Sequence, residues 1–537
     1  MFSLYASLKD LGTFEIISLL IIITAIFSVS IREKFTIRYP SNLPRIVDEG
    51  RSRFSLRTRL LYYTDCERLF KRAYEEYSRH GRSCLIPGMG FRDEVIIPNS
   101  SLKWLVSQPT HKVSIYDAFM EIQHGYYNLG KEIYIQDPWN GQLIGQMNMM
   151  LERLAIEMNE EIASAFESYL GTDPEWKEVN VLKTMRKVIA RASSRFTVGL
   201  PLCRNEKYLD LCLEFTDQFF EVIAYVGLMP KFLRPFLGRV IMLWRLRNIR
   251  AIEKEFKPVF EARLKQFFGE QGSKPSEPQD HLEVMLKFAK AERPNELNLR
   301  DMTCRVATSN LAAFHQTSTM VTNAVFNIVA SDAEFNTIAT LREEISRLTE
   351  GKTWSKALLA KMVHTDSLGK ETLRLHAFGN RSVMRQVVVD DLKTEDGILL
   401  PKGAMLSVLA RPAQVDESVY PDPYKLDPFR FSRSRKEALG GQQDSKPEAE
   451  GNPSFVSLGP NFLPFSYGRH ACPGRFLVDF EFKMLMAYFL SHYDVELPQR
   501  YNGVRPETKW LAEAAMPPPE GRVRIRRRTH DVTSSSL

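Results

Sequence analysis

The spacing of apolar residues along the chain predicts a mainly helical protein with a few short strands. Between about residues 140 and 350, apolar side chains recur every three or four positions, as in helices that bury one face. Glycine and proline interrupt this region at Gly171–Pro174, Pro201, Pro230–Pro235 and Gly269–Pro278. Short apolar runs beside turn residues predict a hairpin within Ser83–Pro98 and strands at Val387–Val389, Ile398–Leu400 and Met405–Val408. The expected fold class is mainly α with small β-sheets (α+β).

An apolar run near the N-terminus predicts a membrane anchor. Leu11–Ile31 holds one charge, Glu15, and a helix of this length reaches about 31 Å, close to the roughly 30 Å hydrocarbon core of a bilayer. Basic residues follow from Arg32 onward, so the positive-inside rule places the rest of the chain in the cytosol. The alternative is a cleavable signal peptide with a small-residue site at Ser28–Ser30. We expect residues 1–38 to be the anchor, with one transmembrane helix at about 11–31.

The rest of the chain is expected to form one catalytic domain over residues 39–520. The stretch at about 433–454 is polar and lacks an apolar period, which predicts a surface insertion. Residues 521–537 are expected to be a basic C-terminal tail. The net charge of +7 is too small for a nucleic-acid-binding protein of this length. It suits an anionic membrane surface or an acidic redox partner.

A second apolar stretch, Phe219–Trp244, is divided by Pro230 and Pro235. One interpretation is a pair of core helices joined by a kinked loop. The other is a loop that dips into the bilayer surface near a substrate entrance, with Lys231 and Arg234 at the lipid headgroups. The sequence leaves both open.

The cysteines point to one exceptional position. The chain has six: Cys66, Cys84, Cys203, Cys212, Cys304 and Cys472. Their irregular spacing, without a C-x-x-C pair, argues against a disulfide framework and against a zinc site. Cys472 lies between Gly468 and Gly474, just before an apolar helix. A thiolate at a helix N-terminus gains from the helix dipole and from free backbone N–H groups, which also tune a metal bound to it.

The segment Phe465–Phe476 resembles the cysteine loop of the cytochrome P450 family, F-x-x-G-x-R-x-C-x-G. Phe465, Gly468, Cys472 and Gly474 match, and His470 replaces the usual arginine. The resemblance implies heme b (iron protoporphyrin IX) with Cys472 as the axial iron ligand, held by the other four residues. Arg469, His470 and Arg475 are candidate partners for the haem propionates.

Two further segments agree with the family. Glu371 and Arg374 stand at i and i+3 on a predicted helix, and Arg430 follows in the segment Asp427–Phe431. Taken alone, an i, i+3 pair is usually a solvated ion pair worth under about 1 kcal/mol. The resemblance implies a structural cluster of Glu371, Arg374 and Arg430 beneath the haem.

A long helix is predicted over Asn298–Val329, with a cap at Asn298. Its middle, Ala312–Ser318, aligns with the family's A-G-x-[DE]-T-[TS]. The family's acid–alcohol pair relays protons to bound dioxygen, and here His315 and Gln316 replace it, followed by Thr317. These three are the candidate oxygen-activation residues, although His315 could instead be a satisfied histidine that faces away from the haem. The pattern resembles fungal microsomal members that oxidise terpenoids or other natural products.

The resemblance implies a haem-dependent monooxygenase that inserts one atom of O2 into a C–H bond of a lipophilic small molecule. No flavin or nicotinamide motif is visible, so electrons are expected from NADPH through a separate NADPH–cytochrome P450 reductase. The expected location is the endoplasmic reticulum membrane, single-pass, with a cytosolic catalytic domain. The alternatives are a haem-thiolate isomerase, desaturase or peroxide-rearranging enzyme, and a non-enzymatic haem carrier or sensor. Candidate pocket residues lie in Ser107–Gly130, Phe219–Leu237 and Ala312–Thr317.

Overall fold

The computed structural model describes residues 37–131, 134, 139–229, 233–268, 280–433 and 454–529. These residues form two compact units. The first holds the described parts of 1–137, 217–248 and 383–409, and the second those of 138–216, 249–382 and 410–537. The expected anchor helix, most of the insertion at 433–454, and Lys231 lie outside the described residues. Within them, no helix combines the length and apolar character that crossing a bilayer requires.

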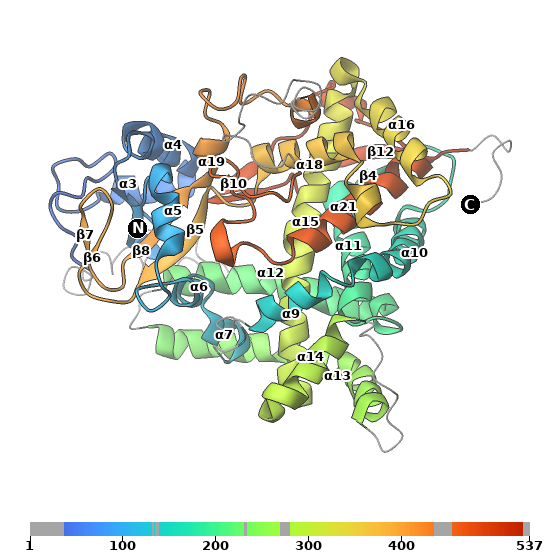
Figure 1. Cartoon of the computed structure of the whole chain (residues 1–537), viewed down its shortest axis with the longest axis horizontal. Helices are drawn as coiled ribbons and strands as arrows, with labels where there is room; N and C mark the ends of the chain where they lie inside the picture. The colour runs from blue at the N-terminus through green and yellow to red at the C-terminus, as the bar shows by residue number, and fades with distance from the viewer. Residues whose placement is uncertain are drawn as a thin grey trace, which may run out of the picture. The chain divides into compact units, whose positions relative to one another are not determined.

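The first unit is built on a five-stranded sheet (Figure 1). In spatial order its strands are β1 (Cys84–Pro87), β2 (Asp93–Ile96), β8 (Met405–Leu409), β5 (Arg381–Val387) and β3 (Val113–Ser114). The predicted hairpin is confirmed, because β1 and β2 pair antiparallel with Leu85 opposite Val95. The short strands β6 (Leu392–Lys393) and β7 (Leu399–Leu400) pair with each other. Among its described residues this unit also holds α3 (Leu56–Thr64), α4 (Cys66–Glu76), α5 (Leu102–Ser107), α6 (Ile115–Gln123), α7 (Gly125–Leu129) and the helical parts of 217–248.

The strand predicted at Val387–Val389 was placed too far along the chain. Strand β5 ends at Val387, and its residues alternate between buried and half-buried from Arg381 onward. Two arginines, Arg381 and Arg385, occupy buried positions of that alternation. The apolar pattern therefore stops short of the true strand.

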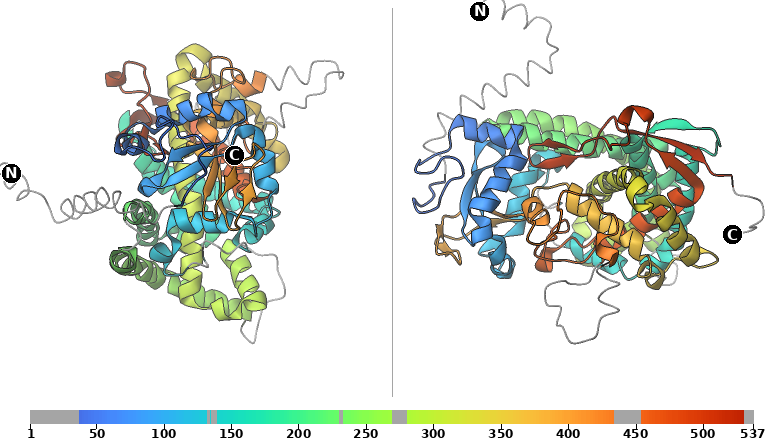
Figure 2. Two further views of the ribbon diagram at one scale, coloured as in Figure 1. Left: turned by 90° about the vertical axis from the view of Figure 1, so that its left-hand side faces the viewer. Right: turned by 90° about the horizontal axis from the view of Figure 1, so that it is seen from above.

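The second unit is helical and is organised around α15 (Leu299–Phe335). This helix of 37 residues packs against α11 (Val181–Thr197) and α18 (Val363–His376). It runs vertically in Figure 1 and is seen nearly end-on in the right-hand view of Figure 2. The predicted cap is present, since the Asn298 side chain accepts a hydrogen bond from the Asp301 backbone N–H at 2.9 Å. Further helices among the described residues of this unit include α9 (Trp139–Met147), α10 (Leu151–Leu170), α14 (His281–Glu292), α16 (Thr337–Thr349), α17 (Lys356–Leu359), α19 (Ala410–Gln414) and α21 (Arg475–His492).

Two small sheets complete the second unit. One pairs β12 (Arg522–Arg527) with β4 (Lys177–Asn180) and β9 (Tyr493–Glu496), and the other is the hairpin of β10 (Lys509–Leu511) and β11 (Ala514–Met516). Strand β12 lies inside the segment expected to be a basic tail at 521–537. Val523 and Ile525 alternate with its arginines and are buried. The packed chain therefore extends at least to Arg527.

The apolar stretch Phe219–Trp244 forms the end of α12 (Glu206–Leu228) and the start of α13 (Arg234–Phe268). Arg234 does not reach the surface as the bilayer interpretation expected. Its side chain is 12% exposed and lies 3.6 Å from a carboxylate oxygen of Glu121 on α6. The exposed residues come after it and form what we call the α13 apolar face: Phe236, Leu237, Val240, Leu243 and Trp244.

Candidate functional site

The geometry of the cysteine loop singles out Cys472. All six cysteines lie in described residues; five are buried and Cys472 alone is exposed. The loop closes through a hydrogen bond from the Cys472 backbone N–H to the Phe465 carbonyl at 2.9 Å. It turns at Ser466 and Gly468, which have φ of 64° and 74°, a conformation that glycine adopts readily. The loop therefore presents the sulfur at the start of α21.

The surroundings of the sulfur differ in one respect from the sequence expectation. The backbone N–H groups of Gly474 and Arg475 point at the thiol, as expected, and with the charge of Arg475 they lower its pKa. Burial has the larger effect and raises the pKa above its ordinary value. Although Cys472 opens onto solvent, the surrounding protein removes much of the hydration of its sulfur. The helix terminus alone does not keep the thiol deprotonated, and binding to a metal ion would have to displace the proton.

The space beside the sulfur fits a flat prosthetic group. A side-chain carbon built at Gly474 would meet only the Cys472 Sγ, at 3.9 Å. In the same loop, the Phe465 ring lies 6.3 Å from the Phe455 ring, which contacts Phe482 of α21 at 5.5 Å. A soft sulfur ligand beside open space, in a loop packed through aromatic rings, is a donor set suited to haem iron.

The three basic residues of the loop are engaged with the loop itself. The Arg469 Nε–H donates to His470 Nε2 at 3.1 Å. The guanidinium of Arg475 donates to the Cys472 carbonyl at 2.8 Å and lies 4.3 Å from the centre of the Phe476 ring. Arg475 thus stabilises the turn that carries the sulfur. Contacts of these three side chains with haem propionates stay a prediction.

The structure brings Glu371, Arg374 and Arg430 together. Glu371 and Arg374 are fully buried and form a bidentate pair at 2.7 and 2.8 Å. Arg430 donates to the same Glu371 carboxylate at 3.3 Å and to the Pro421 carbonyl at 2.6 Å. These three residues, which we call the Glu–Arg–Arg cluster, tie α18 to the segment around Arg430.

A residue missed by sequence reasoning connects this cluster to the cysteine loop. The Gln414 carbonyl, at the end of α19, accepts from Arg374 at 2.9 Å, and the Gln414 side chain accepts from the Leu463 backbone N–H at 3.2 Å. Leu463 lies two residues before Phe465, and its carbonyl accepts from the Ser382 hydroxyl at 3.0 Å. No motif marks Gln414, because its partners are brought close only by the fold.

The middle of α15 has one open face. Ala312 and Gln316 are exposed, although Phe314 and Thr317 beside them are buried. Positions four residues apart lie on the same side of a helix, so Ala312 and Gln316 border the same opening. The small side chain of Ala312 and the amide of Gln316 therefore face the space in which the motif resemblance predicts oxygen and substrate.

The other two candidate oxygen-activation residues point elsewhere. The His315 ring packs edge-on against Phe378, with the ring centres 5.0 Å apart. Burial and the charge of Arg186 lower the pKa of His315 to about 4, so the imidazole is neutral near pH 7. The Thr317 hydroxyl is buried without a hydrogen-bond partner in the described part of the chain. Of the three residues, only Gln316 faces the opening.

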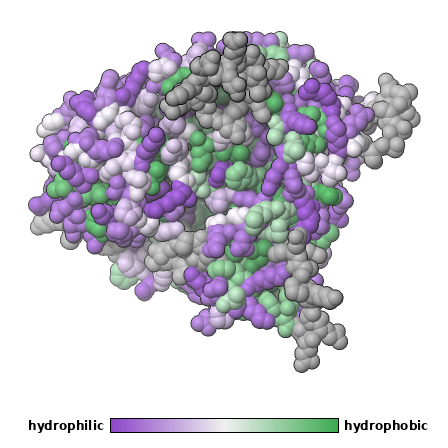
Figure 3. Space-filling model, viewed as in Figure 1, coloured by the Kyte–Doolittle hydropathy of each residue, from purple (hydrophilic) through white to green (hydrophobic). Residues whose placement is uncertain are grey.

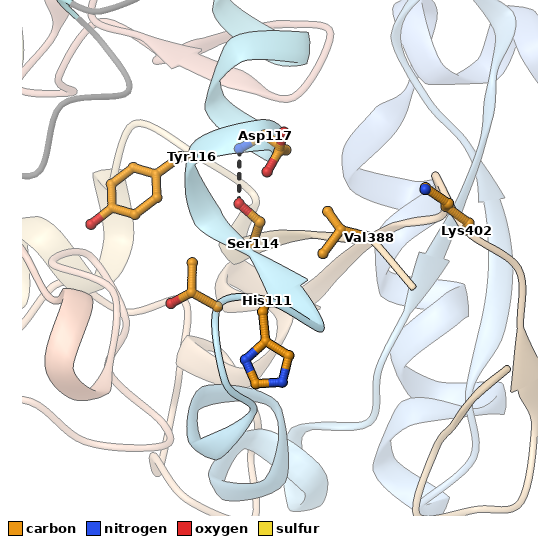
Figure 4. Close-up of a pocket in the computed structure, with 7 residues that line it drawn as sticks. His111, Ser114, Tyr116, Asp117, Val388 and Lys402 are labelled. Atoms are coloured by element: carbon orange, nitrogen blue, oxygen red, sulfur yellow. Dashed lines mark hydrogen bonds between the residues drawn. The ribbon is translucent and has the colours of Figure 1, made fainter. Parts of the chain in front are cut away.

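A surface pocket of about 540 Å³ lies within the first unit (Figure 4). Its lining residues are Thr110, His111, Ser114, Tyr116, Asp117, Val388 and Lys402. The Ser114 hydroxyl accepts from the Asp117 backbone N–H at 3.1 Å, which caps α6. The pocket contains no residue of the cysteine loop or of α15, and we assign it no part in the chemistry.

Comparison with known proteins agrees with the motifs. The sequence model of the family described as Cytochrome P450 matches residues 145–525. Cytochrome P450 monooxygenase pbrC of Penicillium brasilianum is 47% identical over 92% of this chain and 93% of its own length. Cytochrome P450 monooxygenase astC of Aspergillus terreus is 44% identical over 93% and 94%. Cytochrome P450 monooxygenase tenB of Beauveria bassiana is 41% identical over 88% and 89%.

Proposed function

Since the chain belongs to the cytochrome P450 family and is a monooxygenase of that family, we propose that it inserts oxygen into a C–H bond of a lipophilic small molecule, with Cys472 as the axial haem ligand. Membership implies haem, O2, a small substrate and electrons from a redox partner. When bound, the haem supplies the oxygen activation and the C–H chemistry. The observation that carries the assignment of Cys472 is its position as the one exposed cysteine, beside open space at the start of α21.

The chain's own residues have supporting roles in this proposal. The Gly474 and Arg475 N–H groups favour the thiolate once iron has displaced its proton, and the Glu–Arg–Arg cluster fixes the layer that carries the loop. Gln316 can orient a water molecule at the open face of α15, but an amide does not readily pass on a proton. Ala312 leaves room for substrate against the helix.

We propose NADPH–cytochrome P450 reductase as the redox partner. Two exposed apolar side chains support a docking surface at the outer side of the cysteine loop: Phe476 is 40% exposed and Met149 is 75% exposed. Met149 is held near the loop because the adjacent Asn148 donates to the Pro473 carbonyl at 3.0 Å. Arg469 is exposed on the loop and adds a positive charge suited to an acidic partner.

We propose the endoplasmic reticulum membrane as the location, with the catalytic domain in the cytosol. The apolar run Leu11–Ile31 and the basic residues after it support an anchor. The α13 apolar face supports a second contact with lipid, because large exposed side chains such as Phe236, at 73%, and Val240, at 63%, are uncommon on one side of a soluble helix.

The substrate class we propose is a terpenoid or another natural product. Its support is the resemblance around His315 to natural-product members, together with relatives from fungi. One observation favours a second candidate, a haem-thiolate isomerase, desaturase or peroxide-rearranging enzyme. The open face of α15 carries an amide at Gln316 rather than an acid–alcohol pair. Turnover that requires reductase, NADPH and O2 supports oxygen insertion, and turnover without them supports the second candidate.

The carbon-monoxide difference spectrum of the reduced protein tests the ligand assignment. We expect the red-shifted Soret band of thiolate-ligated haem in the unaltered protein and its loss in Cys472→Ala, because no other described cysteine is exposed. Cys66→Ala is the matched control, since Cys66 is buried in α4, and it should keep the band. Absence of the band from the unaltered, haem-reconstituted chain would overturn the proposed function.

A further inference from the structure

Arg505 lies in the segment before the β10–β11 hairpin and joins three parts of the second unit. Its guanidinium donates to the Asn327 side chain, to His376 Nε2 at 2.6 Å and to Asn323 Oδ1 at 2.9 Å. Within its own segment it donates to Thr508 Oγ1 at 3.2 Å and to the Pro506 carbonyl at 3.3 Å. These bonds use all five N–H groups that an arginine has.

The acceptors of Arg505 are amide, imidazole, hydroxyl and carbonyl groups, none of them a carboxylate. Burial lowers the pKa of Arg505 to about 10, so it still carries its charge near pH 7. Holding a cation away from solvent without a counter-ion is costly. The five N–H donors of the planar guanidinium, which we call the donor fork, offset this cost. A lysine or a neutral side chain cannot reproduce the same set of bonds.

Two acceptors of Arg505, Asn323 and Asn327, are buried further along α15 on the same side as its open face. Asn323 and Asn327 come 7 and 11 residues after Gln316, close to whole numbers of helical turns, so all three share one side of the helix. His376 is the last residue of α18. Two residues later, Phe378 packs against His315 of α15. Arg505 therefore anchors the hairpin on the Gln316 side of α15.

The hairpin is also paired with the segment after α18. The Ala515 N–H donates to the Phe378 carbonyl at 2.7 Å, and the Asn380 N–H donates to the Glu513 carbonyl at 3.0 Å. Arg381 forms a bidentate pair with the Glu513 carboxylate at 2.5 and 2.8 Å. At the turn of the hairpin, Leu511 is 71% exposed. The hairpin is thus held to the segment after α18 as well as to the side of α15 that Arg505 contacts, and its turn is open to a ligand.

We propose that Arg505 is a positioning residue of the substrate site, which pins the β10–β11 hairpin to the Gln316 side of α15 and so fixes one wall of the pocket. The inference rests on the proposed function, which places the substrate at the open face of α15. Arg505 itself does not touch substrate. It acts through the hairpin, on the fit of large ligands.

The experiment compares haem-loaded Arg505→Lys and Arg505→Gln with the unaltered chain. Amide hydrogen exchange should become about tenfold faster in peptides covering Lys509–Met516 in both variants, since the fork is lost in both. In the same proteins, the spectral shift on titration with imidazole should give unchanged affinity, because imidazole needs only the iron. The affinity for 4-phenylimidazole, which also needs the wall, should fall about tenfold.

Arg500→Gln is the matched control. Arg500 precedes the same hairpin but forms an exposed bidentate pair with Glu178, at 2.8 Å for both bonds, and should leave exchange and both affinities unchanged. A hairpin that exchanges faster in the Arg505 variants while 4-phenylimidazole affinity holds would overturn the inference and leave the haem assignment intact. Normal behaviour of Arg505→Lys would also overturn it, because the charge rather than the fork would then suffice. Failure of the unaltered chain to show thiolate-ligated haem would instead refute the proposed function.

Discussion

Gln316 is the residue at which this chain departs most consequentially from its family's pattern. It alone of the three candidate oxygen-activation residues faces the opening of α15. In Gln316→Ala the opening loses the amide that can orient water, so product formed per NADPH consumed should fall about tenfold at unchanged haem content. Simultaneous measurement of NADPH, product and hydrogen peroxide checks this. An unchanged ratio of product to NADPH, which we call the coupling, would mean that protons reach the reaction site independently of Gln316.

Thr317→Val provides the contrast on the neighbouring position. The Thr317 hydroxyl is buried with no hydrogen-bond partner in the described part of the chain. Replacing an unpaired buried hydroxyl with a methyl group of similar shape costs little and can stabilise the fold. We expect the free energy of unfolding to stay within about 1 kcal/mol of that of the unaltered protein. The product formed per NADPH consumed should not change. A severe loss of coupling would show that this hydroxyl turns toward the reaction during turnover.

His281 makes the stability of the fold sensitive to acid. Its side chain is fully buried, and burial lowers its pKa from 6.5 to about 4. Between these values the unfolded chain binds a proton that the folded chain does not, so the free energy of unfolding falls as the pH falls from about 6.5 toward 4. Between pH 7 and pH 4, the free energy of unfolding should therefore fall by about 3 kcal/mol less in His281→Leu than in the unaltered chain. Urea unfolding at several pH values measures the difference, and parallel curves would contradict it.

At the scale of elements, the Glu–Arg–Arg cluster shows how burial changes the value of an ion pair. Arg374→Ala removes the bidentate partner of the buried Glu371 carboxylate and leaves it the longer contacts with Arg430 and the Asp427 N–H, which should lower the free energy of unfolding by roughly 3–5 kcal/mol and reduce the yield of haem-loaded protein. Arg72→Ala is the control. Arg72 pairs with Glu76 at 2.8 Å, four residues apart on α4, but both side chains are exposed. The free energy of unfolding should therefore fall by less than about 1 kcal/mol. Full haem content in Arg374→Ala would contradict a structural role for the cluster.

The elements that could be predicted from the sequence are those whose signals are local. The hairpin of β1 and β2 follows from two apolar runs around glycines, and the start of α15 follows from Asn298. The composition of strand β12 predicts a basic tail because its arginines outnumber Val523 and Ile525, but the alternation of these two residues with the arginines is that of a half-buried strand. The direction of His315 and the role of Arg505 could not be predicted. Arg505 and Asn323, for example, are 182 residues apart in the sequence and meet only through the fold.

At the scale of the whole molecule, the proposed membrane location rests on exposed or uncharged apolar segments. Two apolar features are available, the run Leu11–Ile31 and the α13 apolar face. Each large side chain moved from water into the bilayer interface contributes about 1–2 kcal/mol. A chain that lacks residues 1–36 should therefore still bind vesicles of neutral and anionic phospholipids weakly, through the α13 apolar face.

Substitution within that face separates the two contributions. In the shortened chain, Phe236→Ser with Val240→Ser should reduce vesicle binding at least tenfold, because both side chains are more than half exposed and their replacement leaves the packing of α13 intact. In the full-length chain the same pair should change binding little, since the proposed transmembrane helix would hold far more strongly than an interfacial contact. The control is Val504→Ser, an exposed apolar residue outside this face. Equal vesicle binding by the shortened chain with and without the double substitution would show that the α13 apolar face does not contact lipid.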